Sequence, residues 1–311
     1  MLPLKIAKNH KLKTMRKRLF SVAFTLFLLV GALGAKEGAE VRVLAIADIQ
    51  YADKAAKGTR FYRNSIPKLR KIREAVKDEK IDFLIHLGDV VDTKHANLAA
   101  PLAEARKFPY KQYFVMGNHD FEDTTENVEK IRRELGLKDP AYYSFDVKDW
   151  RFVCMDTNRL SSYFKPRNEA LHALATTIQK DIKKARGNWG NSWNGGLDKT
   201  QLEWLDELLK KSETEGKKVV LFAHGQLRPV NSHICLNSDE ITGLLSKYKC
   251  VKAWINGHNH KGGYAKEKGV HYLTISGLVE TKNIVSYAIL ELYADRIEVI
   301  GRGQTPSRTL R

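Results

Sequence analysis

The sequence predicts an α/β protein in which helices pack on a layered sheet core. Short apolar runs rich in β-branched residues alternate with helix-like stretches in the first half of the chain, and the last part is mostly strand-like. No Pro- or Ser-rich linker interrupts this pattern, which favours one domain in a chain of 311 residues. Gly and Pro are scattered and hydrophobic residues make up 43% of the chain, so collagen-like and low-complexity classes are excluded.

The individual elements follow from local patterns. Residues 41–47, VRVLAIA, form a continuous apolar run that is typical of a strand buried on both faces. Residues 65–78 carry apolar side chains at helical spacing with basic residues between them. The other expected strands are 82–87, 112–116, 142–147, 151–156, 218–223, 251–255, 270–275, 286–292 and 295–300. The other expected helices are 97–107, 124–135, 167–185, 199–214 and 238–248. The Gly- and Asn-rich stretch 185–198 is expected to be a long loop, and such loops often carry function.

The N-terminal segment, residues 1–35, has the pattern of a signal peptide. Basic residues precede the apolar run 19–35, which ends in small residues, and Met15 is an alternative start that gives a shorter basic region. The apolar run is short of the roughly 20 residues that span a membrane, which favours cleavage over an uncleaved membrane tether. We therefore expect residues 36–311 to be a single exported domain, periplasmic or secreted, without stable membrane association after cleavage.

The charge of the chain is strongly basic. The formal net charge of +17 falls to +10 when the seven basic residues of the N-terminal segment are set aside. A basic protein attracts nucleotides, phosphates, nucleic acids and anionic lipids alike, so charge does not choose among them. The basic residues are spread along expected helices and no nucleic-acid-binding motif is present, so no specific nucleic acid is expected.

The chain has three cysteines, Cys154, Cys235 and Cys250. The thiols of an exported protein tend to oxidise, and an odd number of cysteines leaves at least one of them unpaired.

Polar side chains of metal-ligand type follow five of the expected strands. Ligands bind beyond the carboxyl ends of the strands in open α/β sheets, so these side chains should meet at one rim. A single Asp after a strand is usually a helix cap or a turn residue, but five strand ends of this kind together predict a metal site. The residues are Asp48, Gln50, Asp89, Asp92, Asn118, His119, Asp120, His224, His258 and His260.

The series D-x-Q, G-D-x-x-D, G-N-H-D, a lone His and G-H-x-H resembles the calcineurin-like metallophosphoesterase family over essentially the whole mature chain. Gln50 departs from the family pattern, because most members have His there. With ADIQYAD (47–53), RFYR (60–63), NGGL (194–197) and GHNHKGGY (257–264), this departure is similar to the manganese-dependent ADP-ribose/CDP-alcohol diphosphatase subgroup. The resemblance implies a layered α/β/β/α sandwich with a metal site at the carboxyl ends of the strands.

The resemblance also implies the roles of the site residues. One divalent ion would be held by Asp48, Gln50, Asp89 and His260. A second would be held by Asp89, which bridges, and by Asn118, His224 and His258. Two such ions lower the pKa of a water that attacks the phosphorus and neutralise charge on the phosphate. We expect Mn²⁺, because Gln50 makes the first site more oxygen-rich, although Fe and Zn suit the ligands as well.

Other residues are expected to act on the substrate. His119 would stabilise the transition state or protonate the leaving oxygen, with Asp120 or another carboxylate orienting its ring, while Asp92 orients the site. Arg60 and Arg63 would grip a phosphate, or are ordinary solvated residues at a helix start. Tyr51 would stack on a base or pack in the core, and the loop residues Trp193 and Asn194 would shape the pocket rim.

The resemblance implies a small-molecule phosphate ester as substrate, cut at the pyrophosphate of an ADP-ribose or CDP-alcohol type of compound. An exported phosphomonoesterase or cyclic nucleotide phosphodiesterase on the same fold is the main alternative. A non-catalytic scaffold is disfavoured, because every ligand position is filled. The oligomeric state stays open.

Overall fold

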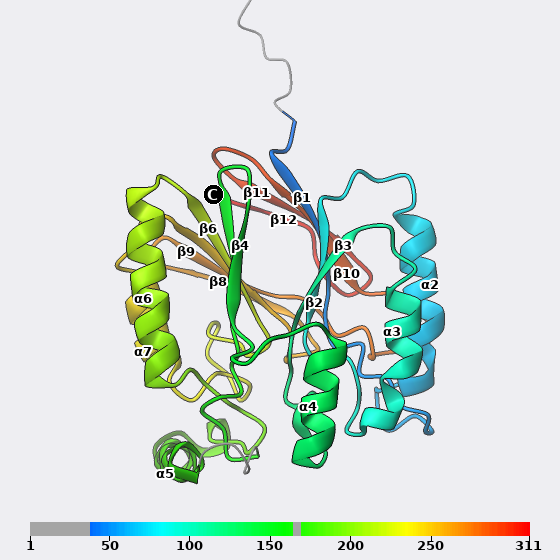
Figure 1. Ribbon diagram of the computed structural model, residues 1–311, viewed down its shortest axis with the longest axis horizontal. Helices are drawn as coiled ribbons and strands as arrows, with labels where there is room; N and C mark the ends of the chain where they lie inside the picture. Colours follow the sequence, from blue (N-terminus) through cyan, green and yellow to red (C-terminus); the bar gives the residue numbers. More distant parts are fainter. Residues whose placement is uncertain (1–37, 164–168) are drawn as a thin grey trace, which may run out of the picture. The chain divides into compact units, whose positions relative to one another are not determined.

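Two six-stranded sheets form the centre of the fold in the computed structural model, which describes residues 38–163 and 169–311 (Figure 1). The first sheet has the strand order β12-β11-β10-β1-β2-β3, in which β1, β2 and β3 run parallel and the other three pair antiparallel. Its strands are β1 (Val41–Ile46), β2 (Phe83–Leu87), β3 (Lys111–Val115), β10 (Tyr287–Leu292), β11 (Ile297–Arg302) and β12 (Arg308–Leu310).

The second sheet has the order β4-β5-β6-β7-β9-β8. Strands β5, β6, β7 and β9 run parallel, and β4 and β8 are antiparallel edge strands. The strands are β4 (Tyr143–Val147), β5 (Trp150–Cys154), β6 (Lys218–Ala223), β7 (Val251–Asn256), β8 (Gly263–Glu267) and β9 (Val270–Thr274). Each sheet thus contributes a set of parallel strands whose carboxyl ends can carry ligands.

Helices cover the outer faces of the two sheets (Figure 1). The helices α2 (Ser65–Ala75), α3 (Ala99–Ala105) and α4 (Thr125–Glu134) lie on the side of the first sheet, and α6 (Lys199–Thr214) and α7 (Ser238–Leu245) on the side of the second. Helix α5 (Glu169–Arg186) packs its Ile178 and Ile182 against Leu160 and Leu236. The order of layers is the α/β/β/α sandwich that the family resemblance implies.

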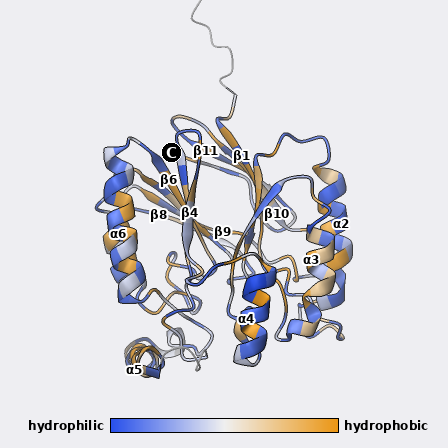
Figure 2. Cartoon of the chain, viewed as in Figure 1, coloured by the Kyte–Doolittle hydropathy of each residue, from blue (hydrophilic) through white to orange (hydrophobic). Residues whose placement is uncertain are grey.

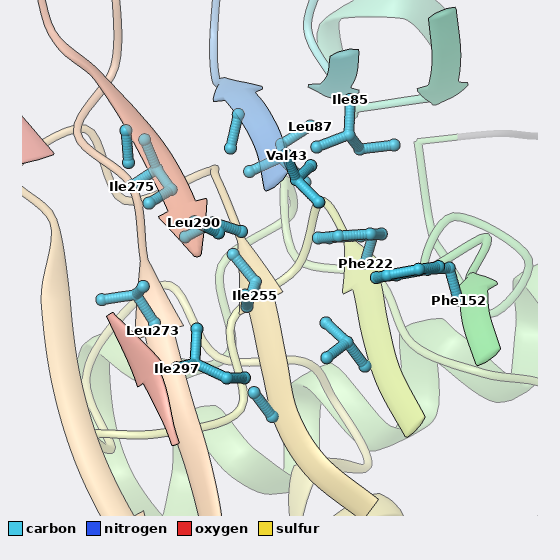
Figure 3. Packing of buried hydrophobic residues seen from close by; sticks show 14 of the residues in the cluster. Val43, Ile85, Leu87, Phe152, Phe222, Ile255, Leu273, Ile275, Leu290 and Ile297 are labelled. Atoms are coloured by element: carbon cyan, nitrogen blue, oxygen red, sulfur yellow. The ribbon is translucent and has the colours of Figure 1, made fainter. Parts of the chain in front are cut away.

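Alternation along the strands builds this sandwich. In β1, Val43 faces the core between the sheets, while its neighbour Leu44 faces helix α2. In β6, Phe222 faces the same core and Leu221 faces α6 and α7. Both faces of each central strand are therefore apolar, which explains the continuous hydrophobic runs in the sequence. Figure 2 shows hydrophobic colouring along the central strands, and Figure 3 shows Val43 and Phe222 among the side chains packed in the core between the sheets.

The expected elements are all present within a few residues of their predicted bounds, and α6 begins and ends as predicted. Two strands, β8 and β12, were not predicted, because both are edge strands with few apolar residues. The predicted signal peptide over 1–35 lies outside the described residues. Among residues 38–163 and 169–311, no helix is long and apolar enough to cross a membrane. The three cysteines are buried and unpaired.

Candidate metal centre

The carboxyl ends of β1, β2, β3, β6 and β7 converge, and the backbone turns sharply at three of them. Asp48, Gln50, Asp89 and His258 have positive φ angles of 51°, 43°, 51° and 68°. This conformation is uncommon for residues other than glycine and costs of the order of 1–3 kcal/mol each. It turns side chains that follow the parallel strands back toward one point. The site is thus held in place at a conformational cost that the surrounding sheets must offset.

Two glycines of the sequence motifs are required by this crowding. A Cβ atom on Gly117 would overlap the carboxylate of Asp89, and one on Gly257 would lie 2.7 Å from Asp48 Oδ2. The G-N-H and G-H-N-H motifs therefore begin with glycine because a carboxylate from another strand end packs directly against the backbone.

One cluster of ligand atoms surrounds His224. Its Nε2 lies 3.3 Å from Asp89 Oδ2, 3.1 Å from Asn118 Oδ1 and 3.2 Å from His258 Nδ1. Nitrogen and oxygen ligands sit about 2.0–2.2 Å from a first-row divalent ion, so ligands of one ion lie roughly 3.0–3.4 Å apart. His224 Nδ1 donates to the Leu87 carbonyl at 2.8 Å, which leaves Nε2 free to bind. The cluster therefore fits a metal ion.

A second cluster adjoins it. Asp48 Oδ1 lies 3.3 Å from His260 Nε2, and ligand atoms of Asp48, Asp89 and His224 all lie within 4.8 Å of one another. Gln50 Nε2 donates to Asp92 Oδ1 at 3.0 Å, which fixes the orientation of the amide. Among the residues that the structure describes, Asp48 Oδ2 and Gln50 Oε1 are buried without a hydrogen-bond partner.

Such unpaired buried oxygens are costly unless something else satisfies them. A divalent cation would do so for both at once, since carboxylate and amide oxygens are ligands that hard divalent ions accept. The donor set of this second cluster therefore also fits a metal ion.

Two further residues orient the imidazoles. His258 Nε2 donates to Asn194 Oδ1 at 3.0 Å, and His260 Nδ1 donates to Glu280 Oε1 at 2.7 Å. Each bond leaves the other ring nitrogen free to face a metal ion. Glu280 was not predicted, because it belongs to no motif and reaches the site from the loop before β10.

Asn194, predicted at the pocket rim, lies behind the ligands. It is 1% exposed, and its Nδ2 donates to the carbonyls of Trp189 and Ser232. Both polar atoms of its side chain are therefore engaged within the protein, and its Oδ1 orients His258.

The shifted pKa values of His224, His260 and Asp89 show that the site favours positive charge. Burial alone would lower the pKa of His224 and His260, but Asp89 and Asp48 respectively outweigh it and raise both to about 9. Burial alone would raise the pKa of Asp89, yet His224 and His119 hold it below its ordinary value. Burial and the adjacent His224 keep the pKa of His258 well below its usual range. The carboxylates thus draw cations into a buried site.

His119 lies at the edge of this cluster. Its backbone amide donates to Asp89 Oδ1 at 2.8 Å, and its ring Nδ1 lies 3.2 Å from Asp92 Oδ1 and 3.4 Å from Glu122 Oε1. Burial opposes its protonation, but Asp89 and Glu122 outweigh burial and raise its pKa. The carboxylates next to its ring are therefore those of Asp92 and Glu122. An orienting role was predicted for Asp92 but not for Glu122.

Asp120 does not orient that ring, contrary to the first of the predicted alternatives. Its carboxylate accepts the backbone amides of Val90, Val91 and Gly117 at 2.9–3.1 Å. Burial and the neighbouring Asp89 raise the pKa of Asp120 to about 7. Asp120 therefore ties the turn after β2 to the turn after β3 through three backbone amides.

A cavity of about 250 Å³ opens over these residues. Its lining combines the ligand groups with a cation, a carboxylate and two aromatic rings. The lining residues are Arg60, Asp89, Asn118, His119, Glu122, Trp193, His233, His258 and His260. His233 and Glu122 were not predicted as site residues, because neither belongs to a motif and only the fold brings them here.

The remaining predicted substrate contacts separate into two groups. Arg60 lines the cavity, as predicted. Arg63 does not line it: its Nε bonds to Asp53 Oδ1 at 2.6 Å on the exposed surface, which is the alternative of a solvated helix-start residue. Tyr51 is partly buried against the hydrophobic cluster around Leu69, which is the alternative of core packing, and it is not among the residues that line the cavity.

Parallel strands that aim carboxylates, amides and imidazoles at one seam between two sheets are the arrangement of a dinuclear metal-dependent hydrolase. The sequence profile of the calcineurin-like phosphoesterase family matches residues 41–262, and the chain belongs to this family. It is 28% identical to a Xenopus laevis protein over 85% of this chain and 88% of that protein. It is 30% identical to an Oryza sativa subsp. japonica protein over 82% of this chain and 89% of that one. Both relatives are named manganese-dependent ADP-ribose/CDP-alcohol diphosphatase.

A solved structure shares the fold. The crystal structure of a dimetal phosphatase from Danio rerio superposes with a TM-score of 0.78 at 25% sequence identity. The match covers 88% of this chain and 99% of that chain, so it includes both sheets and the strand ends that carry the site.

Proposed function

We propose that this chain hydrolyses the pyrophosphate linkage of nucleoside diphosphate-linked compounds of the ADP-ribose or CDP-alcohol type, with two Mn²⁺ ions. The observation that carries the proposal is the pair of ligand clusters that share Asp89 beneath a cavity lined by Arg60 and His119. The names of the relatives, which cover nearly all of the described chain, support the choice of substrate class and metal.

The ligand atoms divide between two ions. Asp48, Gln50, Asp89 and His260 would hold the first. Asp89, Asn118, His224 and His258 would hold the second. When bound, two such ions lower the pKa of a water and neutralise charge on the phosphate oxygens. The amide oxygen of Gln50 makes the first set rich in oxygen, which supports Mn²⁺ over a softer ion.

The other residues of the cavity would bind and orient the substrate. Arg60 offers a planar set of donors that can bind two phosphate oxygens at once. His119 faces the cavity with carboxylates behind its ring, which favour the imidazolium form that can donate a proton to the leaving oxygen.

The aromatic wall would hold the rest of the substrate. The rings of Trp193 and His233 lie 6.4 Å apart, and Trp193 is 43% exposed. A cavity of about 250 Å³ is smaller than most ligand pockets, which hold roughly 300–1,000 Å³. The phosphates would therefore sit inside, and one end of the substrate would extend past Trp193.

A hydrolysis panel tests this proposal. The protein is stripped of metal and supplied with Mn²⁺, Mg²⁺, Zn²⁺ or Fe²⁺ separately. ADP-ribose, CDP-choline, a cyclic nucleotide and an aryl phosphate are then compared by kcat/KM, with His119→Ala as the blank. We expect Mn²⁺ to restore cleavage of ADP-ribose or CDP-choline to a nucleoside monophosphate. Cleavage of the aryl phosphate or the cyclic nucleotide alone would instead support the phosphomonoesterase or phosphodiesterase alternative.

We also propose that the protein is exported, periplasmic or secreted. The support is the sequence of residues 1–35, with its basic start, apolar run and small-residue end. Mass spectrometry of the protein recovered from outside the cytoplasm should give an N-terminus near residue 36. An intact N-terminus on membrane-bound protein would support the tethered alternative.

A further inference from the structure

Lys68 is a buried lysine on helix α2 whose ammonium group is fully used. The residue is 2% exposed. Its Nζ donates to the carbonyl oxygens of Leu278 at 2.6 Å, Glu280 at 2.7 Å and Thr281 at 2.7 Å. An ammonium has three hydrogens to donate, and here each one has a backbone acceptor. Three carbonyls from one short segment thus bind a single charged side chain.

The segment that Lys68 holds, residues 277–281, lies against two strand ends of the metal centre. The amides of Leu278 and Val279 donate to the carbonyls of Ala47 and Asp48, each at 2.9 Å. The amide of Gly277 donates to the His260 carbonyl at 3.0 Å. The segment therefore joins the backbone that carries Asp48 to the backbone that carries His260.

The same segment carries the carboxylate that orients His260. Glu280 Oε1 accepts from His260 Nδ1 at 2.7 Å, while the Glu280 carbonyl accepts from Lys68. Lys68 and His260 thus hold the backbone and the side chain of one residue. A shift of the Glu280 backbone would move its carboxylate off the imidazole.

Arg60 depends on the segment as well. Arg60 and Glu280 face each other in an antiparallel bridge. Residues on either side of Arg60 bond to the segment: the Phe61 amide donates to Val279, and the Thr59 carbonyl accepts from Thr281, each at 2.9 Å. The backbone of the cavity arginine is therefore aligned by the strand-like segment that Lys68 secures.

Burial of an ammonium is unfavourable unless its hydrogen bonds are complete, and removal of it would leave three carbonyls without their donor. Burial lowers the pKa of Lys68 to about 8, with the charge of Glu280 opposing the shift, so the ammonium persists at neutral pH. Three convergent carbonyls are matched by a cation with several donors, so the bonds of Lys68 fix the position of the segment.

We propose that Lys68 is a positioning residue of the metal centre, which holds Glu280 against His260 and Arg60 at the cavity through the carbonyls of residues 278, 280 and 281. The inference rests on the proposed function, because it assigns His260 to the first of the two ions. It adds a residue of helix α2 that no motif marks and that touches neither metal ligand nor cavity.

Metal binding by the full chain tests this role without a substrate. Lys68→Met keeps the length of the side chain and removes its donors, and Lys71→Met on the exposed face of the same helix is the matched control. Mn²⁺ titrations of metal-stripped protein, followed by calorimetry and by the electron paramagnetic resonance of free Mn²⁺, should show two ions in the wild type. In Lys68→Met we expect one ion to bind at least about 10-fold more weakly and the other to be unchanged. Lys71→Met should bind both as the wild type does.

A double-mutant cycle with Glu280→Gln separates positioning from general stabilisation. If Lys68 acts through Glu280, the double variant should bind the weakened ion no more weakly than the worse single variant does. Losses that add fully would mean that Lys68 does not act through Glu280. Two wild-type Mn²⁺ affinities in a Lys68→Met protein with a lowered Tm would mean that Lys68 only stabilises the fold. Either result overturns the proposal.

Lys68→Gln provides the test if Lys68→Met does not fold. It keeps one amide donor, so a smaller loss at the same ion is expected, and wild-type affinity for both ions overturns the proposal. Failure of this proposal can be distinguished from failure of the proposed function. A wild-type protein that binds fewer than two Mn²⁺ ions, or that binds two and cleaves no pyrophosphate linkage, contradicts the proposed function. The role of Lys68 is tested separately, by comparing the Mn²⁺ affinities of Lys68→Met and the wild type.

Discussion

His86 in strand β2 makes the stability of this protein depend on pH. Its ring stacks on Phe114 with the centroids 4.3 Å apart, its Nε2 lies 3.1 Å from Gln112 Oε1, and 1% of the residue is exposed. Burial lowers the pKa of His86 from 6.5 to about 4, and the bond to Gln112 opposes that shift only in part. The unfolded chain therefore binds a proton near pH 6.5 that the folded chain refuses until about pH 4, so unfolding takes up a proton in this window.

The free energy of unfolding should fall as pH decreases through that window. The full shift corresponds to about 3 kcal/mol, of which about 2.5 kcal/mol is reached between pH 7.5 and 4.5. His86→Phe keeps an aromatic ring on Phe114 but binds no proton. The stability of the wild type relative to this variant should therefore drop by about that amount over the range. Urea unfolding at half-unit pH steps, with EDTA present to remove bound metal, measures the difference.

Val115→Ala on the neighbouring strand β3 is the control. Val115 is fully buried and does not titrate, so its truncation should lower stability by the same amount at every pH. If the wild-type and His86→Phe curves instead run parallel from pH 7.5 to 4.5, the folded protein accepts the proton at no cost. The physical account of His86 as a neutral buried base is then refuted.

Three further predictions concern the site. Gln50→Leu should weaken one of two Mn²⁺ ions by about 10-fold, because it removes a buried oxygen that has no hydrogen-bond partner and fits a metal ion; unchanged binding in the Mn²⁺ titration would contradict this. Asn194→Ala should weaken Mn²⁺ binding by about 10–100-fold and Asn194→Asp much less, since Asp keeps the acceptor for His258; equal losses would remove the orienting role. Arg60→Met should raise KM for ADP-ribose by about 10-fold or more, whereas Arg63→Met should leave kcat/KM within about two-fold; equal effects of the two substitutions would show that the cavity lining does not set affinity.

The sequence predicted the fold and the ligand residues from the same feature, the change from an apolar strand to a polar motif. Asp48 and Asp89 stand directly after buried strands, where spacing alone places them at a sheet edge. Strand β8 escaped prediction because an edge strand needs few apolar residues. The central strands were predictable because burial on both faces requires a continuous run of apolar residues. The helices were predictable because burial of one face places apolar residues at helical spacing.

The orienting residues could not be predicted in the same way. Glu280 and His233 lie outside the motifs, and only tertiary packing brings Glu280 to His260 and His233 to the cavity. Asn194 was identified as a site residue from its motif, but its bond to His258 was not predicted, because a sequence does not show whether an amide is exposed or buried. In the structure its side chain makes three hydrogen bonds and is almost completely buried.

The position of the site at the seam between the sheets explains why it carries both strain and unpaired atoms. Asp89 follows a strand of the first sheet and His224 follows a strand of the second, yet their ligand atoms lie 3.3 Å apart. Two sheets packed through a rigid apolar core fix that separation before any ion arrives. Some ligands bond to one another, as His224 does to Asn118, but Asp48 Oδ2 and Gln50 Oε1 have no hydrogen-bond partner, and the backbone at both residues is left-handed. The stability of the two sheets therefore maintains a site arranged to bind cations. The conformational strain and the unpaired oxygens that this arrangement costs lie on the predicted ligands themselves.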